Sequence, residues 1–67
     1  MDLKIIGDKI KKIRKNKGYT QIEFAHLCNF DRTYLSRIEN GKQNITIEML
    51  FLICDKLKIE PLEIFKK

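Results

Sequence analysis

The stretch "TQIEFAHLCNFDRTYLSRIENG", Thr20–Gly41, decides the fold, because two helix signals in it are separated by a turn signal. Thr20 and Glu23 have the spacing of a capping box, in which each side chain accepts a hydrogen bond from the backbone amide of the other residue. A helix is therefore predicted to start at about Gln21. Its inward-facing side chains are expected to be Phe24, Leu27, Cys28 and, in part, Ile22.

This helix can run for only about two turns, because the tripeptide "NFD" follows it. Asn29 tolerates a left-handed backbone, and Asp31 is a strong N-cap residue whose carboxylate suits the positive end of the next helix. A second helix is predicted from Arg32 to about Glu39, where the dipeptide "NG" stops it. Two short helices joined by a three-residue turn form a helix-turn-helix candidate, at about residues 21–40.

The second helix of this pair is predicted to have two faces. Leu35 and Ile38 lie three residues apart and face the core, with Tyr34 beside them. The open side carries mostly hydrogen-bond donors, from Arg32, Thr33, Ser36 and Arg37. Glu39 lies near the C-terminal end, where its charge opposes the helix dipole and calls for a cationic partner. Taken alone, such a polar face is more often simply solvated than a binding surface.

Three further helices are predicted around this pair. Apolar residues at three- and four-residue spacing indicate a first helix that ends before Gly18, through Leu3, Ile6, Ile10 and Ile13. Thr46 caps a fourth helix that runs through Leu57, and Pro61 opens a short fifth helix that reaches about Phe65. The chain is therefore expected to be all-α, with five helices.

Length and charge indicate one small domain with an anionic partner. A chain of 67 residues buries only ~60% of its unfolded surface, so a single domain over residues 1–67 is expected. The net charge is +5, and residues 1–44 contain ten Lys and Arg against five Asp and Glu, whereas residues 45–67 contain four of each kind. The excess favours a polyanion, although solubility alone is the simpler explanation.

Several functions have no support in the sequence. The longest apolar run, Met49–Cys54, has six residues, against the ~20 that span a membrane, so a cytoplasmic location without membrane attachment is expected. Cys28 and Cys54 form no CxxC pair and have only His26 near them, so no metal site is predicted and both thiols are read as buried apolar groups. Without a phosphate-binding loop or nucleophile motif, no enzyme activity, cofactor or small-molecule ligand is expected.

The run from Thr20 to Lys42 resembles the helix-turn-helix of the phage Cro and repressor class, known as the XRE family. The matching features are Gln21 at the start of the first helix, Ala25 where the helices cross, the closing "ENG" and the apolar residues Phe24, Cys28, Phe30, Leu35 and Ile38. The resemblance extends to both ends of the chain and implies a compact five-helix bundle of the phage repressor DNA-binding domain type, with helices two and three as the helix-turn-helix. Asn29 departs from the family, which usually has Gly there. The segment "DRTYLSRIENGKQNIT" looks most like the small controller proteins of restriction-modification systems.

The resemblance implies that the second helix of the motif enters the major groove of double-stranded DNA. Arg32 can make paired bonds to guanine O6 and N7, and Thr33 can offer its hydroxyl or its methyl group to a base. The expected base contacts are Arg32, Thr33, Tyr34, Ser36 and Arg37. The expected phosphate contacts are Gln21, Asn40, Lys42, Gln43 and Asn44. The family also implies that Arg14 pairs with Glu39.

The last two helices carry more apolar residues than one chain needs. They suggest a dimer interface made of Met49, Phe51, Leu52, Ile64 and Phe65. Alternatively, the fifth helix covers this area within one chain.

The expected function is transcription regulation by a homodimer on a palindromic operator, in a bacterial or phage-encoded protein that is associated with the nucleoid when bound. A restriction-modification controller, a phage repressor and an antitoxin would look alike, and the alternative is a module that binds another protein through this surface.

Overall fold

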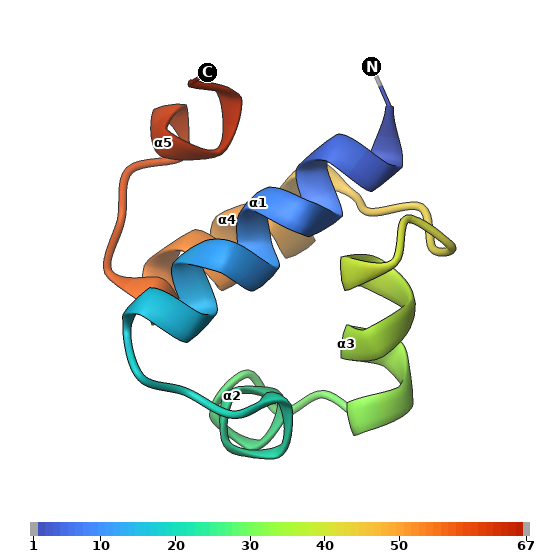
Figure 1. Ribbon diagram of the computed structural model, residues 1–67, viewed down its shortest axis with the longest axis vertical. Coiled ribbons are helices and arrows are strands. Elements are labelled where there is room, and N and C mark those ends of the chain that lie inside the picture. Colours follow the sequence, from blue (N-terminus) through green and yellow to red (C-terminus); the bar gives the residue numbers. More distant parts are fainter. Residues whose placement is uncertain (1, 67) are drawn as a thin grey trace.

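The computed structural model describes residues 2–66, and within them the chain forms five α helices and no strand (Figure 1). The helices are α1 (Leu3–Asn16), α2 (Gln21–Leu27), α3 (Arg32–Glu39), α4 (Ile47–Leu57) and α5 (Leu62–Phe65). The predicted fold class is therefore confirmed. The predicted domain, 1–67, includes one residue at each end that lies outside the described part. No helix in residues 2–66 is long and apolar enough to cross a membrane.

Side-chain caps fix the starts of two helices as the sequence predicts. The Thr20 hydroxyl accepts from the Glu23 amide at 3.1 Å, and the Glu23 carboxylate accepts from the Thr20 amide at 2.8 Å, so the capping box at α2 is complete. Thr46 caps α4 in the same way, by accepting from an amide at 3.1 Å. Asp31 does occupy the N-cap position of α3, but its exposed side chain makes no capping hydrogen bond, which corrects that prediction.

The turn between α2 and α3 is closed by backbone bonds and a left-handed residue. Asn29 has φ 60°, as its sequence context predicts. The Phe30 amide donates to the Ala25 carbonyl at 2.8 Å, and the Asn29 amide donates to the His26 carbonyl at 3.0 Å. These are the two bonds of a Schellman motif. The turn therefore has the backbone conformation of the predicted helix-turn-helix without the glycine.

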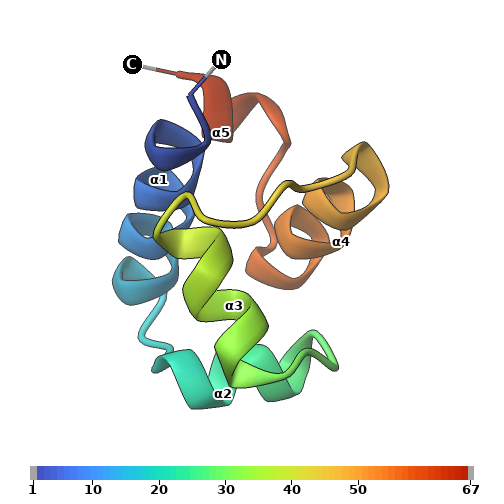
Figure 2. The same cartoon turned by 90° about the vertical axis from the view of Figure 1, so that its right-hand side faces the viewer.

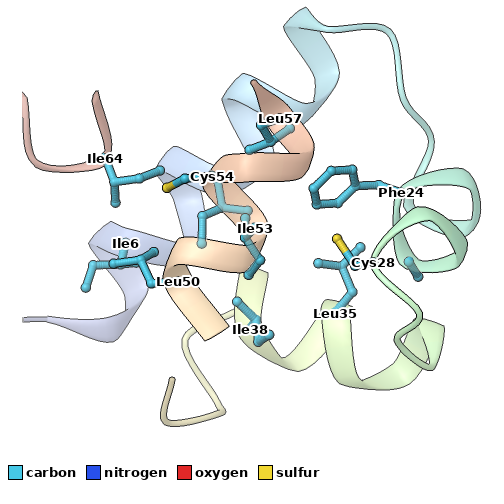
Figure 3. Close-up of a cluster of buried hydrophobic side chains, with 12 residues drawn as sticks. Ile6, Phe24, Cys28, Leu35, Ile38, Leu50, Ile53, Cys54, Leu57 and Ile64 are labelled. Carbon is cyan, nitrogen blue, oxygen red and sulfur yellow. The ribbon is translucent and has the colours of Figure 1, made fainter. Parts of the chain in front are cut away.

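The hydrophobic core lies between α4 and the other helices, as Figure 3 shows for most of its side chains. Its buried members are Ile6, Ile10, Phe24, Ala25, Cys28, Leu35, Ile38, Leu50, Ile53, Cys54, Leu57 and Ile64. Ile64 is 3% exposed, so its predicted place in the dimer interface is wrong: α5 folds back and buries this side chain within its own chain. Leu27 at 41% and Ile22 at 65% exposure also do not face inward as predicted.

A glycine allows α1 to press against the end of α3. A Cβ atom added at Gly7 would lie 2.3 Å from the Ile38 carbonyl oxygen and 2.6 Å from that of Glu39, both backbone atoms. Figure 2 shows the two helices side by side. This contact holds α3 against the scaffold at its C-terminal end and leaves the opposite face of α3 open.

Candidate nucleic-acid interface

A buried ion pair connects α1 to the C-terminal end of α3. The Arg14 guanidinium donates from Nε to Glu39 Oε2 at 2.7 Å and from Nη2 to Glu39 Oε1 at 3.1 Å. Both residues are buried, at 4% and 1% exposure. Arg14 Nη1 also donates to the Tyr19 carbonyl at 2.7 Å, so the pair extends to the loop between α1 and α2. This is the pair that the family resemblance implies, and it places the acidic group of α3 away from solvent.

Gln21 joins the same network, which the sequence did not indicate. Its Nε2 donates to Glu39 Oε1 at 3.1 Å, and the side chain is half-buried. One amide hydrogen is therefore directed at the scaffold, while the amide group has a second hydrogen that can donate elsewhere. The predicted phosphate contact at Gln21 would consequently be made by a side chain whose orientation is set by the ion pair.

The outer face of α3 presents the first two predicted base contacts to solvent. Arg32 and Thr33, in the first turn of the helix, are exposed. Tyr34 is half-buried, and its ring meets the edge of Phe30 with 5.1 Å between ring centroids and an interplanar angle of 83°. Much of Tyr34 is therefore scaffold, as an edge-to-face aromatic pair fixes the direction of the ring. Arg32 and Thr33 have no such constraint.

The remaining predicted contacts lie toward the C-terminal end of α3 and in the segment that follows. Ser36 and Gln43 are half-buried, whereas the other predicted residues of this group, Arg37, Asn40, Lys42 and Asn44, are exposed. Asn40 Nδ2 donates to the hydroxyl of Ser36 at 3.4 Å. Arg37 does not extend freely into solvent, because its guanidinium bonds to the Lys42 carbonyl and to the Gln43 side chain.

The charge of this face is positive. From residue 32 to residue 44 the cations are Arg32, Arg37 and Lys42, all exposed, and the single acid is Glu39, which is buried in its ion pair. Asp31, just before α3, is an exposed acid at one edge of this face. A surface of exposed donors with its one internal carboxylate neutralised matches what phosphates and the acceptor edges of bases require.

The two thiols take no part in this face. Cys28 and Cys54 are free and buried in the core. Burial raises the pKa of Cys28 to about 11, against a smaller opposite effect of the Lys56 charge, and burial also raises the pKa of Cys54. Both thiols are therefore protonated near neutral pH and behave as small apolar groups. Among residues 2–66, no three His, Cys, Asp or Glu side chains come together as a metal site would need.

Several apolar side chains on α4 and α5 are exposed or half-buried. Phe51 is 51% exposed and Phe65 is 44% exposed, while Met49 and Leu52 are half-buried. Ile47, one turn before Phe51 on α4, is 63% exposed. Ile47 is not among the residues predicted for the dimer interface, but its exposure places it with them. The surface that a partner could cover is therefore Ile47, Met49, Phe51, Leu52 and Phe65, called the α4–α5 surface below.

Comparisons with known proteins place the chain among regulators of this shape. The helix-turn-helix family matches residues 10–64. The control protein C.MunI of a Mycoplasma species is 46% identical over 66 residues, which cover 96% of this chain and 89% of that protein. The antitoxin PezA of Streptococcus pneumoniae is 38% identical over 60 residues, but these cover only 38% of PezA and 90% of this chain.

A solved structure shows the same fold bound to DNA. The restriction-modification controller protein C.Esp1396I, as a tetramer in complex with its natural 35 base-pair operator, matches with a TM-score of 0.83 and 43% identity, over 94% of this chain and 83% of that one. Helix order, the α2–α3 turn and the family match over most of the length agree with one another. The chain belongs to the helix-turn-helix family of the XRE/Cro-C1 type.

Proposed function

We propose that this chain is a sequence-specific regulator of transcription that binds double-stranded DNA as a homodimer on a palindromic operator. The observation that carries the proposal is the outer face of α3, where the exposed side chains are hydrogen-bond donors, the one carboxylate within the helix is buried in its pair with Arg14, and the helix is fixed to the scaffold from behind. The operator complex of the similar C.Esp1396I protein supports the same conclusion. Such a regulator acts in the cytoplasm, on the nucleoid, and needs no catalytic group.

In this proposal the residues at the start of α3 read the sequence. A recognition helix directs its N-terminal residues at base edges in the major groove. Arg32 donates two bonds to a guanine, and Thr33 contacts a neighbouring base. Lys42 and Asn44, both exposed after the end of α3, bind phosphates and set the position of the helix along the groove.

The α4–α5 surface supports the homodimer. It gathers large apolar side chains that the folded chain leaves partly in contact with water. A twofold dimer through one such surface brings two α3 helices to half-sites about one DNA turn apart. Phe51 is the more exposed of the two aromatic residues of the surface, so Phe51→Glu should give a monomer at concentrations where the wild type sediments as a dimer. A wild type that sediments as a monomer at high micromolar concentration would contradict the dimer.

Control of a restriction-modification operon is the specific role that the comparisons favour. The C.MunI control protein is matched over nearly its whole length, whereas the match to the antitoxin PezA covers a minor part of that protein. The antitoxin role is the second candidate, because PezA is nonetheless a close match over this domain. In that case a different protein, rather than a second copy of this chain, would occupy the α4–α5 surface.

The deciding experiment is selection of bound fragments from a random DNA pool, followed by affinity measurements on the selected sequence over a range of salt concentrations. Binding through phosphates gives a steep salt dependence from counterion release. Arg32→Ala should lose ~1–3 kcal/mol and relax the preference at one guanine, whereas Lys42→Ala should weaken all sequences alike and lower the salt slope by about one. No enriched sequence, or an unchanged base preference in Arg32→Ala, would contradict the assignment.

A further inference from the structure

We infer that Arg37 is a positioning residue, whose guanidinium holds the segment after α3, residues 40–44, in the shape that binds phosphate. Its place on the outer face of α3 suggests a base contact, which is what the sequence predicts. We infer instead that Arg37 does not read a base. The inference rests on the proposed DNA-binding function, but it concerns a different part of the interface from Arg32 and can be tested on the free protein.

The backbone first turns the segment back toward Arg37. Gly41 has φ 70°, a left-handed conformation that favours glycine. Its amide donates to the Ile38 carbonyl at 3.1 Å, and the Lys42 amide donates to the Arg37 carbonyl at 2.8 Å. These two bonds form a Schellman motif, which ends α3 and places Lys42 directly beside the base of the Arg37 side chain.

The Arg37 side chain then holds the other side of the same residue. Its Nη2 donates to the Lys42 carbonyl at 3.0 Å, so both the amide and the carbonyl of Lys42 are bonded to Arg37. Its Nε donates to Gln43 Oε1 at 3.3 Å, and Gln43 Nε2 donates on to the Asn44 carbonyl at 3.5 Å. The Arg37 guanidinium thus connects the end of α3 directly to Lys42 and Gln43, and through Gln43 to Asn44.

The segment is also supported from the side of α1. A Cβ atom at Gly41 would lie 2.7 Å from the Lys4 Cα, so the chain passes against the start of α1 with no room for a side chain. With α1 on one side and Arg37 on the other, residues 42–44 have a fixed backbone while the Lys42 and Asn44 side chains remain exposed. An ordered backbone with free polar side chains reduces the entropy that must be lost when they bind phosphate.

Reading a base with the Nε–Nη2 edge of its guanidinium would require Arg37 to give up these bonds. Paired recognition of guanine takes two adjacent donors of a guanidinium. The Nε and Nη2 donors of Arg37 form one such pair, and both are directed at the segment. These two bonds also fix the plane of the guanidinium, so the other pair, Nη1 with the second hydrogen of Nη2, does not turn freely toward a base. Moving them to a base would release Lys42 and Gln43 at the point where phosphate contacts are expected.

The first experiment measures backbone order in the free protein by ¹⁵N relaxation. In Arg37→Ala, order parameters at residues 42–44 should fall from about 0.85 to below about 0.6, while those of α3 stay unchanged. Arg37→Lys keeps the charge but lacks the paired donors, so order should fall nearly as far. Arg32→Ala removes an exposed arginine from the same helix and should leave residues 42–44 as ordered as in the wild type. Unchanged order in Arg37→Ala would overturn the inference.

The second experiment measures affinity for the DNA sequence that the wild type selects. If Arg37 acts through the segment, Arg37→Ala keeps the base preference of the wild type, and Lys42→Ala weakens binding by a smaller factor in the Arg37→Ala background than alone. A preference relaxed at one base, or equal factors in both backgrounds, would overturn it. A wild type that selects no DNA sequence would contradict the proposed function. The relaxation measurement needs no DNA, so it would still decide whether Arg37 holds the segment.

Discussion

Removal of the Glu39 carboxylate should cost this domain a large part of its stability. The carboxylate is 1% exposed and accepts three hydrogen bonds, two from Arg14 and one from Gln21. In Glu39→Ala the Arg14 guanidinium stays buried without its counter-charge, a change that costs ~3–5 kcal/mol in comparable pairs. A chain of 67 residues has a total stability of about 3–10 kcal/mol, at ~0.05–0.15 kcal/mol per residue. The variant is therefore expected to lose about a third or more of the stability at the upper end of this range, and to be unfolded at room temperature at the lower end.

Urea unfolding followed by circular dichroism, at one protein concentration for all variants, would measure this loss. In thermal unfolding followed by the same signal, the midpoint of Glu39→Ala should fall by ~12–40 °C, because each kcal/mol lowers it by ~4–8 °C in a domain of this size. The control is Glu60→Ala, which removes an exposed acid between α4 and α5 and should change the free energy of unfolding by less than about 0.5 kcal/mol.

A double variant separates the lost pair from the unpaired charge. Arg14→Met with Glu39→Met replaces both partners by apolar side chains, so no buried charge is left, and it should be more stable than Glu39→Ala. If Glu39→Ala unfolds at the urea concentration of the wild type, the ion pair does not stabilise the fold. If the double variant is the less stable of the two, the cost does not come from the stranded Arg14 charge.

Two further predictions concern the core. Gly7→Ala places a methyl group 2.3 Å from the Ile38 carbonyl oxygen. Although alanine favours helices, this variant should destabilise the domain by ~1–3 kcal/mol in urea unfolding. The control Lys12→Ala, on the exposed side of α1, should change the free energy of unfolding by less than about 0.5 kcal/mol. Equal stability of Gly7→Ala and the wild type would disprove the close approach of α1 and α3. Burial raises the pKa of Cys28 from 9.0 to about 11, so between these two values the native state keeps a proton that the unfolded state loses. The contribution of the protonated thiol to stability is therefore fully present below pH 9.0 and is lost as the pH rises from 9.0 toward 11. Urea midpoints measured across this range should show a smaller alkaline loss in Cys28→Ala, and an equal loss would contradict the shift.

The sequence predicted most of the secondary structure because the helix ends carry strong local signals. The capping box at Thr20, the cap at Thr46 and the left-handed turn at Asn29 each depend on residues close together in the chain. Lys58, which ends α4 with φ 59°, was not predicted, because lysine is not a residue that local preference places in a left-handed conformation. There the helix is closed by the two bonds of a Schellman motif, from the Lys58 amide to the Asp55 carbonyl at 3.1 Å and from the Ile59 amide to the Cys54 carbonyl at 3.0 Å.

Side-chain directions were less predictable, because a helical wheel shows which residues share a face but not which neighbour covers it. The buried residues of this region are Phe24, Ala25 and Cys28, and at about 100° per residue Leu27 lies beside the face they form, so it remains exposed. Ile64 was assigned to a partner because the return path of α5 cannot be read from a four-residue helix. The bond from Gln21 to Glu39 joins residues 18 positions apart, a distance across the fold for which a single sequence gives no signal. The bonds of Arg37 are closer in the chain, but they depend on how the turn after α3 folds back.

The two faces of α3 differ in what a change to them can affect. Leu35, Ile38 and Glu39 hold the helix to the rest of the chain, whereas Arg32 and Thr33 are exposed and add little to that attachment. If these two residues read bases as proposed, substitutions at their positions change the preferred DNA sequence while the domain continues to fold. Descendants of such a protein could acquire new target sites one side chain at a time, and a designer could retarget the domain by varying the same two positions in a combinatorial library.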